Sequence, residues 1–234
     1  MNIKDRIKNF LYGYYGFKHT FSECGEDSIL RRIFYEKIKK EEKGFYVDVG
    51  SFHPYYSSVT QLLSLEGWTG INIDPREGTK NLFDSKRKKD VNLEMAISSL
   101  DGEAKYYETE IAPSLNSISL ERFDQLNIRD KITREVKVPC CRLDTLFDKY
   151  LDGENFDLLN IDVEGHDLKV LQSNNWVKYR PRVICVEIDG FSIQDILNSE
   201  TYLFLKELGY EFVAKNYILP RISTCFFLDK KSPI

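Results

Sequence analysis

The stretch Phe45-Tyr46-Val47-Asp48-Val49-Gly50-Ser51 predicts the centre of the fold. Its short apolar run is typical of a buried strand, and an acidic residue and a glycine stand where that strand ends. Further along the chain, Gly70-Ile71-Asn72-Ile73-Asp74 repeats the pattern and is closed by Pro75. The sequence therefore predicts two buried strands, each with an aspartate at its C-terminal end.

Strands and helices alternate on both sides of this stretch. Alternation of this kind is typical of an α/β fold with a mainly parallel sheet and helices on both faces, and the last two strands are expected to form an antiparallel pair. Ligands of such sheets bind beyond the C-terminal ends of the strands. Further strands are expected at 91–97, 104–107, 136–141, 156–161, 182–188, 210–214 and 223–228, and helices at 26–40, 57–65, 78–86, 119–126, 143–150, 167–173 and 193–208.

The chain of 234 residues is expected to form a single domain, 1–234. Residues 1–43 are interpreted as an N-terminal helical preamble. Residues 109–135 break the alternation, because they are rich in serine, asparagine and charged residues, and we interpret them as an inserted lid or specificity segment. A solvated charged loop is the alternative for each charge in this segment. The candidates for contacts to substrate phosphates are Asn116, Arg122, Arg129 and Arg134.

The composition excludes several functional classes. With 33 basic and 37 acidic residues the net charge is −4, so the chain has no general attraction for nucleic acid. The N-terminus lacks the apolar core of a secretory signal, and no run is apolar enough for a transmembrane helix. The five cysteines show no zinc-binding spacing. We therefore expect a cytoplasmic protein with reduced thiols.

The aromatic N-terminal residues allow two interpretations. A basic stretch precedes them, which is compatible with docking on a membrane surface or on a partner. The interpretation we favour is that they pack over the sheet or form the contact of a homodimer. The aromatic residues are Phe10, Tyr12, Tyr14, Tyr15 and Phe17.

A third motif places several reactive groups on one turn. Asn160-Ile161-Asp162-Val163-Glu164-Gly165-His166 contains two carboxylates and an imidazole between an expected strand and an expected helix. Such groups can act as general base, substrate ligands or metal ligands. Helix capping explains one acid, and His166 alone is an ordinary residue at a helix N-terminus. Two acids exceed what a cap needs, so we interpret this turn as part of a site.

Asp74 is a candidate for binding a nucleoside. An acidic side chain at the end of the second strand is suited to accept two hydrogen bonds from a ribose diol. A nicotinamide-dependent oxidoreductase would use it in the same way, but the chain lacks the GxGxxG fingerprint of those enzymes. A helix-start turn is the structural alternative, because Pro75 follows. The combination with Asp48-Val49-Gly50 favours a nucleoside-like ligand.

Taken in order, these motifs resemble the FkbM family of S-adenosylmethionine-dependent methyltransferases. The resemblance covers residues 21–189 and implies a Rossmann-like class I methyltransferase fold with the cofactor over the first two strands. It departs from the family at Glu23, where glutamine is frequent. The blocks that carry it are FSECGED at 21–27, FYVDVGSFHP at 45–54, GWTGINIDP at 67–75, IDVEGHDL at 161–168 with VLQSN at 170–174 and Trp176, and YRPRVI at 179–184 with Glu187.

The resemblance implies S-adenosylmethionine as cofactor and assigns residues to each part of it. The residues after the first strand are expected against the methionine part, and Asp74 is expected on the ribose. The end of the third strand would border the adenine, while the preamble covers the cofactor. The expected cofactor-binding residues are Glu26, Asp27, Asp48, Gly50, Ser51, Asp74, Met95, Ala96 and Asp162.

Methyl transfer to a hydroxyl requires a base or a metal, because the pKa of an alcohol lies far above neutral pH. The catalytic candidates are Asp162 as a wall of the site and Glu164 or His166 as the base. A Mg²⁺ ion held by Asp162 with Glu187 or Asp189 is one open alternative. The other is that these acids only hydrogen-bond to substrate hydroxyls.

The expected substrate follows from the resemblance and from the acid-rich rim. Members of the family mostly methylate hydroxyls of sugars or polyketides, and such a rim suits a polyhydroxyl acceptor. We therefore expect O-methylation of a sugar, on a nucleotide-linked or glycan precursor of a surface polysaccharide or natural product. A methyltransferase-fold binding protein without catalysis is the remaining alternative, which the retained aspartates and Glu164 argue against.

Overall fold

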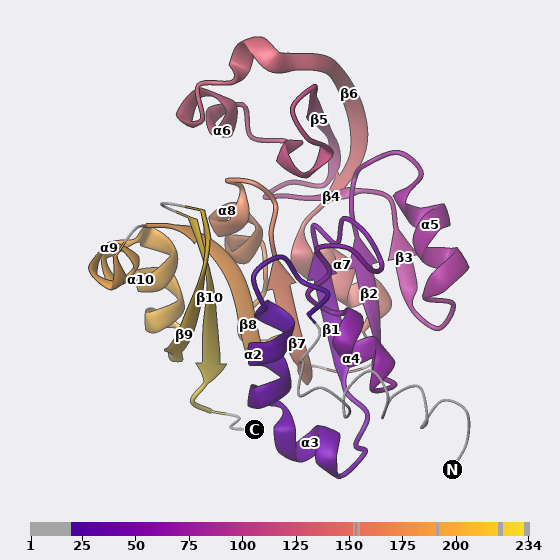
Figure 1. Ribbon diagram of the computed structural model, residues 1–234, viewed down its shortest axis with the longest axis vertical. Coiled ribbons are helices and arrows are strands. Elements are labelled where there is room, and N and C mark those ends of the chain that lie inside the picture. The colour runs from indigo at the N-terminus through magenta and orange to yellow at the C-terminus, as the bar shows by residue number, and fades with distance from the viewer. Residues whose placement is uncertain (1–19, 152, 154, 191, 220–221, 232–234) are drawn as a thin grey trace.

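The computed structural model describes residues 20–151, 153, 155–190, 192–219 and 222–231. Its centre is a seven-stranded sheet in the order β3-β2-β1-β7-β8-β10-β9 (Figure 1). Neighbouring strands are parallel from β3 to β8, whereas β10 is antiparallel to both β8 and β9, which confirms the expected α/β class. The strands are β1 (Phe45–Val49), β2 (Thr69–Ile73), β3 (Val91–Leu93), β7 (Asn155–Ile161), β8 (Arg180–Asp189), β9 (Tyr210–Leu219) and β10 (Ile222–Asp229).

The two faces of this sheet carry separate hydrophobic cores, because successive side chains of a strand point to opposite faces. Val47 and Val49 of β1 belong to a core that includes side chains of α7, α8, α9 and α10. Tyr46 belongs to the other core, with side chains of α2 and α4. The helices are α2 (Glu26–Ile33), α3 (Tyr35–Lys39), α4 (Gln61–Leu65), α5 (Thr79–Lys86), α7 (Leu143–Tyr150), α8 (Asp167–Gln172), α9 (Ile193–Asn198) and α10 (Glu200–Glu207).

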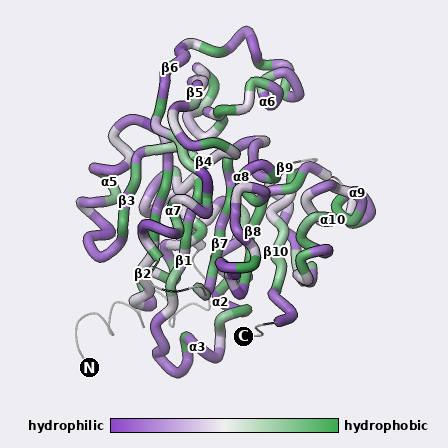
Figure 2. The backbone as a smooth tube through the Cα atoms, turned by 180° about the vertical axis from the view of Figure 1, so that it is seen from behind, coloured by the Kyte–Doolittle hydropathy of each residue, from purple (hydrophilic) through white to green (hydrophobic). Residues whose placement is uncertain are grey.

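The order of the strands places the site. The chain runs from β1 outward through β2 to β3 and later returns to the other side of β1 with β7. Parallel sheets bind ligands at the point where the strand order reverses, so the C-terminal ends of β1 and β7 are the expected location. In Figure 2 the hydrophobic residues concentrate along the central strands, and hydrophilic residues dominate around α3 and α5.

A second, three-stranded sheet lies beyond the C-terminal ends of the central strands (Figure 1). Its order is β4-β6-β5, and β5 and β6 are antiparallel. The predicted 109–135 segment joins these two strands and includes their adjoining ends. The elements of this unit are β4 (Ala96–Ile97), β5 (Gly102–Thr109), η1 (Pro113–Leu115), α6 (Leu120–Gln125), η2 (Arg129–Lys131) and β6 (Ile132–Cys141).

Several predicted elements need correction. The strand expected at 91–97 is two strands, because β3 pairs with β2 in the central sheet whereas β4 pairs with β6 in the second sheet. The helix expected at 193–208 is interrupted at Ser199, whose hydroxyl accepts a hydrogen bond from Tyr202 N and so starts α10. The helix expected at 57–65 is confined to α4, at 61–65.

The N-terminal region and the cysteines complete the description. The first 19 residues, with the aromatic segment of the preamble, lie outside the described residues. Within the part of the chain that the structure describes, no helix is both long and apolar enough to cross a membrane. All five cysteines are free thiols.

Candidate active site

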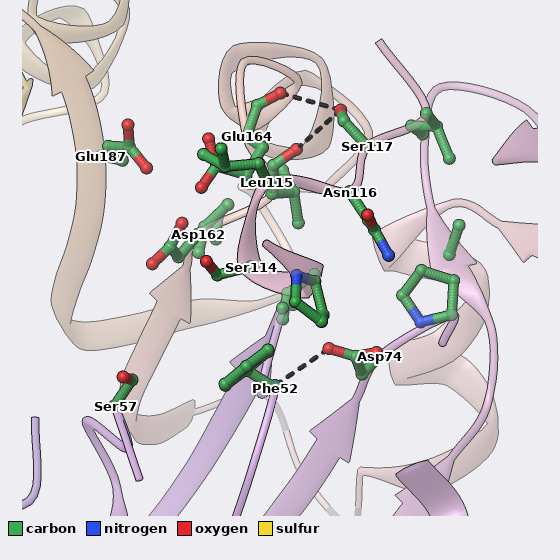
Figure 3. A pocket seen from close by; sticks show the side chains of 18 of the residues that line it. Phe52, Ser57, Asp74, Ser114, Leu115, Asn116, Ser117, Asp162, Glu164 and Glu187 are labelled. Atoms are coloured by element: carbon green, nitrogen blue, oxygen red, sulfur yellow. Dashed lines mark hydrogen bonds between the residues drawn. The ribbon is translucent and has the colours of Figure 1, made fainter. Parts of the chain in front are cut away.

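A cavity of about 500 Å³ opens at the C-terminal ends of the central strands (Figure 3). One wall comes from the ends of β1, β2, β7 and β8. Residues 95–97 and 111–118 form the side toward the second sheet, and Glu23 and Glu26 add a contribution from the N-terminal region. The cavity is therefore built at the reversal of the strand order, where the topology predicts a ligand.

Asp74 lies at the β2 side of this cavity, and hydrogen bonds from nearby residues hold its carboxylate in place. Its Oδ2 accepts a hydrogen bond from Phe52 N at 2.9 Å, and its Oδ1 accepts from Arg76 N at 2.9 Å and from the Thr79 hydroxyl at 3.4 Å. Burial nevertheless raises the pKa of this carboxyl, and the hydrogen bonds counteract the shift. Each carboxylate oxygen has two acceptor sites, so the group retains acceptor capacity toward the cavity.

Gly50 shapes the floor of the cavity between β1 and β7. Its φ of 84° lies in the left-handed region, and a Cβ atom built there would stand 1.7 Å from the carbonyl oxygen of Asp162. No side chain fits in that space. The glycine thus lets the turn after β1 lie directly against the turn after β7.

Asp48 and Ser51, which were predicted on the cofactor, lie outside the described lining of the cavity. The Asp48 carboxylate is buried and accepts hydrogen bonds from the Thr60 hydroxyl and from Asn160 Nδ2, both at 2.8 Å. Ser51 N donates to the carbonyl of Ile73 at 3.1 Å. Both residues therefore support the turn that carries Gly50, and their predicted contact with a cofactor stays a prediction.

The two acids of the N-terminal block have different surroundings. Glu26 lines the cavity and is 2% exposed. Its Oε2 accepts from Cys24 N at 2.9 Å, whereas its Oε1 is buried with no hydrogen-bond partner. Asp27 instead accepts from Phe21 N at 2.7 Å and from the Thr20 hydroxyl at 2.6 Å, and it lies outside the described lining. Glu26 thus has an acceptor oxygen available to a ligand in the cavity, while Asp27 fixes the segment that precedes α2 through its hydrogen bonds.

The predicted adenine side is apolar. Met95 and Ala96 line the cavity together with Ile97 and Tyr106. Burial raises the pKa of the Tyr106 hydroxyl, so this group is neutral at physiological pH. This wall is suited to a flat, uncharged part of a ligand.

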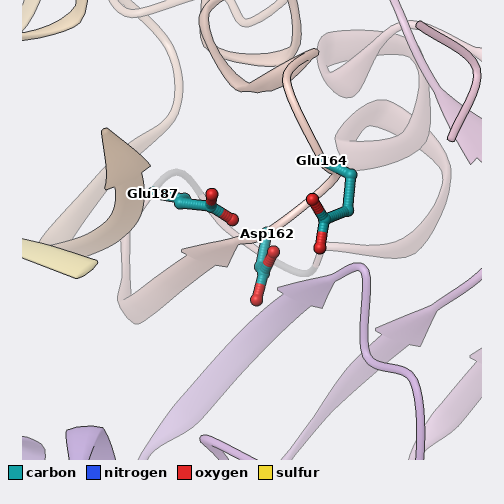
Figure 4. A group of neighbouring side chains, drawn as sticks. All are labelled: Asp162, Glu164 and Glu187. Atoms are coloured by element: carbon teal, nitrogen blue, oxygen red, sulfur yellow. The ribbon is translucent and has the colours of Figure 1, made fainter. Parts of the chain in front are cut away.

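Three carboxylates face one another at the ends of β7 and β8 (Figure 4). Asp162, Glu164 and Glu187, here called the acid trio, each place one oxygen within 4.8 Å of the others, and all three line the cavity. Burial, and then the charge of Asp162, raises the pKa of Glu164 to about 7. Burial and neighbouring acids raise the pKa of Glu187 to about 8 and that of Asp162 well above its usual range. Glu164 and Glu187 can therefore hold and release protons near neutral pH.

The metal set that was predicted differs from the observed grouping. Asp162 and Glu187 are together as expected, but Glu164 stands in the third place instead of Asp189. The Asp189 side chain is 56% exposed and accepts from Arg122. Oxygen donors of this kind fit a hard cation such as Mg²⁺, but buried acids also gather around an arginine.

Arg122, which was predicted as a phosphate contact, is buried against these acids. Its guanidinium donates to Glu187 at 2.9 Å, to Asp189 at 2.9 Å and to Glu164 at 3.3 Å. The other predicted phosphate contacts also have protein partners: Arg129 pairs with Asp124, Arg134 pairs with Glu77 and Glu108, and Asn116 lines the cavity while accepting from Thr109 N.

His166 lies outside the described lining of the cavity. Its Nε2 shares a hydrogen bond of 2.8 Å with the Ser98 hydroxyl, and its Nδ1 is buried without a partner. Burial lowers the pKa of the imidazole to about 4, so the ring is neutral at pH 7. Of the two predicted bases, Glu164 is the one that reaches the cavity.

Sequence reasoning missed two features of this site. The first is the pairing of Arg122 with the acids, since residues 122 and 187 are far apart in the sequence. The second is η1, whose Ser114 and Leu115 line the same cavity as the acid trio (Figure 3). The proline at the start of η1 was the available signal for a turn in this segment.

Comparisons with known proteins identify the family. No curated protein matches the chain significantly. A solved structure of similar arrangement is a TehB-like SAM-dependent methyltransferase from Corynebacterium glutamicum, with 9% identity, a TM-score of 0.43 and coverage of 97% of this chain and 98% of that one. The family model of the methyltransferase FkbM domain matches residues 48–212, from the end of β1 to the start of β9. The expected Rossmann-like methyltransferase fold is thus confirmed, and the chain belongs to the FkbM methyltransferase family.

Proposed function

We propose that the protein is an S-adenosylmethionine-dependent O-methyltransferase that acts on a hydroxyl of a sugar. Family membership implies S-adenosylmethionine as the methyl donor. One observation carries the proposal: a single cavity contains both the hydrogen-bonded carboxylate of Asp74 and the acid trio. The first group is suited to a nucleoside and the second to proton transfer, as an alkylation of a hydroxyl requires.

The residues around the cavity fit this cofactor in chemical type. Asp74 can accept from ribose hydroxyls, and the wall with Met95 and Ala96 is suited to an adenine. The unpartnered Oε1 of Glu26 is a buried acceptor for an ammonium group. Gly50 leaves the floor of the cavity free of side-chain atoms. These five residues support the predicted binding of the cofactor. For Glu26 the sequence predicted only that it covers the cofactor, so its contact with the ammonium group is an addition to that prediction.

The chemistry is divided between the cofactor and the chain. The cofactor supplies an electrophilic methyl group, so the protein has to orient the acceptor hydroxyl and remove its proton. Glu164 has a pKa of about 7, so a useful fraction is ionised at neutral pH and can take that proton. Asp162, closer to the end of β7, would fix the direction of the hydroxyl by accepting from it.

The acid trio also supports the class of acceptor. Three carboxylates that lie within 4.8 Å of one another provide several acceptor sites for neighbouring hydroxyls. Vicinal hydroxyls of a pyranose would satisfy these sites better than an isolated alcohol would. We therefore infer a nucleotide-linked or glycan-bound sugar as the acceptor and place the reaction in the cytoplasm, in the biosynthesis of a surface polysaccharide or a natural product.

A pooled assay tests the proposal. The purified protein is incubated with methyl-labelled S-adenosylmethionine and a panel of sugar nucleotides and glycosides, and products are identified by mass and by the stability of a methyl ether. The expected result is one labelled sugar ether that is formed by the wild type and by Asp124→Asn, a change on the exposed part of α6, but not by Glu164→Gln. Label on nitrogen, sulfur or no acceptor at all would overturn the O-methyltransferase assignment.

A further inference from the structure

Arg122 is the buried cation at the edge of the site. It belongs to α6, in the 109–135 segment, yet its side chain is only 3% exposed and makes ion pairs with acids at the ends of β7 and β8. Arg122 is not among the described residues that line the cavity, although two of its partners, Glu164 and Glu187, are. Its contacts therefore join the 109–135 segment to the part of the cavity where proton transfer is proposed.

The donors of the guanidinium are divided among three acids. Nε and Nη2 donate to Glu164 Oε2, both at 3.3 Å, and Nη2 also donates to Glu187 Oε1 at 2.9 Å. Nη1 donates to both oxygens of Asp189, at 2.9 and 3.2 Å. A planar fork with five N–H groups can make this set of contacts, whereas the ammonium of lysine cannot.

The turn after β7 is shaped to receive this side chain. Glu164 and Gly165 both have positive φ values, 52° and 85°, which is uncommon for a glutamate. A Cβ atom at Gly165 would lie 3.1 Å from Arg122 Cδ and 3.2 Å from its Cβ, so the turn packs against the stem of the arginine. The Ser117 hydroxyl adds a second link, because it donates to the Glu164 carbonyl at 2.8 Å. The strained turn is thus held from the side of the 109–135 segment.

We infer that Arg122 is a positioning residue that latches the 109–135 segment onto the site and holds Glu164 and Glu187 in their places for methyl transfer. Glu164 contacts the arginine at one oxygen and faces the cavity with the rest of the carboxyl. Without the guanidinium of Arg122, the Glu164 carboxylate is free to leave the reacting position, and α6 loses its ion pairs with the acids at the ends of β7 and β8. The cofactor side of the cavity, around Asp74, has no contact with Arg122 among the described hydrogen bonds and is left unchanged. The positioning of Glu164 and Glu187 for methyl transfer rests on the proposed function, whereas the attachment of the 109–135 segment does not.

The first test asks, without any cofactor, whether Arg122 holds α6 in place. Amide hydrogen exchange is compared in the wild type, Arg122→Gln and Arg129→Gln, a matched control whose pair with Asp124 is exposed on the same segment. Arg122→Gln should speed exchange in α6 by about tenfold or more, since each factor of ten corresponds to about 1.4 kcal/mol of opening free energy. Exchange in β1 should be unchanged. Equal exchange of α6 in all three proteins would overturn the latch.

The second test separates positioning from general structure. In Arg122→Gln, kcat should fall at least tenfold, while the affinity for S-adenosylhomocysteine, measured by calorimetry, should stay within about twofold. Arg122→Lys should restore part of kcat, since it keeps the charge but not the fork, and it serves if the glutamine variant does not fold. An unchanged kcat, or a loss of cofactor affinity in parallel with kcat, would overturn the role. Failure of the wild type to bind the cofactor would instead refute the proposed function and leave the exchange result standing.

Discussion

The carboxylate of Asp74, at the end of β2, accepts hydrogen bonds from neutral donors, whereas the three carboxylates at the ends of β7 and β8 face one another. Asp74 accepts from two backbone N–H groups and a hydroxyl. In the acid trio, Glu164 and Glu187 pair with Arg122, and burial together with neighbouring acids raises the pKa of each of the three members. This difference fits the proposed function, in which the β2 side holds the cofactor in a fixed place and the β7–β8 side exchanges protons.

The second arrangement is costly for the folded protein. Glu187 is buried and Asp162 and Glu164 are partly so, which disfavours their charged forms. Asp167 adds a further buried acid beside them, with its pKa raised to about 8. Asp167 itself has a structural function, because it accepts from Val163 N and Gly165 N within the turn. Groups that cost stability and persist at a cavity are typical of functional sites.

The largest effect is expected on kcat, from a substitution that changes only the β7–β8 side of the cavity. Glu164→Gln removes the proposed base but keeps the size of the side chain and its position next to Arg122, so kcat should fall by about 10²- to 10⁴-fold. Steady-state kinetics with the acceptor found in the pooled assay measures this loss. The control is His166→Asn, which should leave kcat within a few-fold, because the imidazole lies outside the described lining. The reverse outcome would make His166 the base.

The next largest effect is expected on the affinity for the cofactor, from a substitution at the β2 side of the cavity. Asp74→Ala removes the two hydrogen bonds proposed to the ribose. A hydrogen bond to a charged group is worth about 1.5–3 kcal/mol, and less where water can replace it. The dissociation constant of the cofactor should therefore rise by about tenfold to a few hundredfold. Acceptor affinity should change little. Because the carboxylate also accepts from Phe52 N and Arg76 N, a melting curve is recorded alongside. Collapse of the fold without cofactor would make Asp74 a structural cap.

A smaller effect concerns the dependence of stability on pH. Glu187 titrates in the folded state at about 8 but at its ordinary value when unfolded, so the folded state binds the extra proton. The free energy of unfolding therefore falls as the pH rises from about 4.5 to 8, by at most about 1.4 kcal/mol per pH unit for one group. Glu187→Gln should weaken this fall.

Thermal melting at several pH values measures it. In a domain of this size about 2–4 °C correspond to 1 kcal/mol, so the loss of melting temperature between pH 5.5 and 8 should be several degrees smaller in Glu187→Gln than in the wild type. An exposed control, Glu103→Gln, should follow the wild type. If the melting temperature falls equally with pH in all three proteins, Glu187 is ionised over the whole range from pH 5.5 to 8, and the prediction is wrong.

The smallest expected effect is that of a chelator. Arg122 already supplies a positive charge to Glu164 and Glu187, so we expect turnover to be unchanged after prolonged treatment with a chelator and gel filtration. Loss of turnover that is restored by Mg²⁺ would return the acid trio to the role of metal ligands.

The sequence predicted the fold well because the signals were local. Strand ends such as Asp48-Val49-Gly50 and Asp74-Pro75 combine an apolar run with residues that stop it, and the alternation of elements then specifies a parallel sheet. The division of 91–97 between two sheets was not predictable, because it depends on the pairing of β4 with β6, at the distant Cys140 and Cys141.

That some candidate residues meet at one cavity could be predicted for the same reason, whereas their roles stay a prediction. Asp74, Asp162 and Glu164 follow strands directly, so the topology brings them to one edge and into one cavity. Asp48 and His166 also stand next to that edge, but their side chains point to other partners, Thr60 and Ser98. Which way a side chain turns at a strand end, and which distant arginine meets an acid, is decided by tertiary packing and not by spacing.

Calorimetric titration with S-adenosylhomocysteine tests the division of the cavity most directly. The wild type, Asp74→Ala and Glu164→Gln are compared under one set of conditions. We expect micromolar binding to the wild type, weaker binding by about tenfold or more to Asp74→Ala, and wild-type affinity in Glu164→Gln. Equal affinity of the wild type and Asp74→Ala, or a loss of binding confined to Glu164→Gln, would contradict the assignment of the β2 side to the cofactor and of the β7–β8 side to proton transfer.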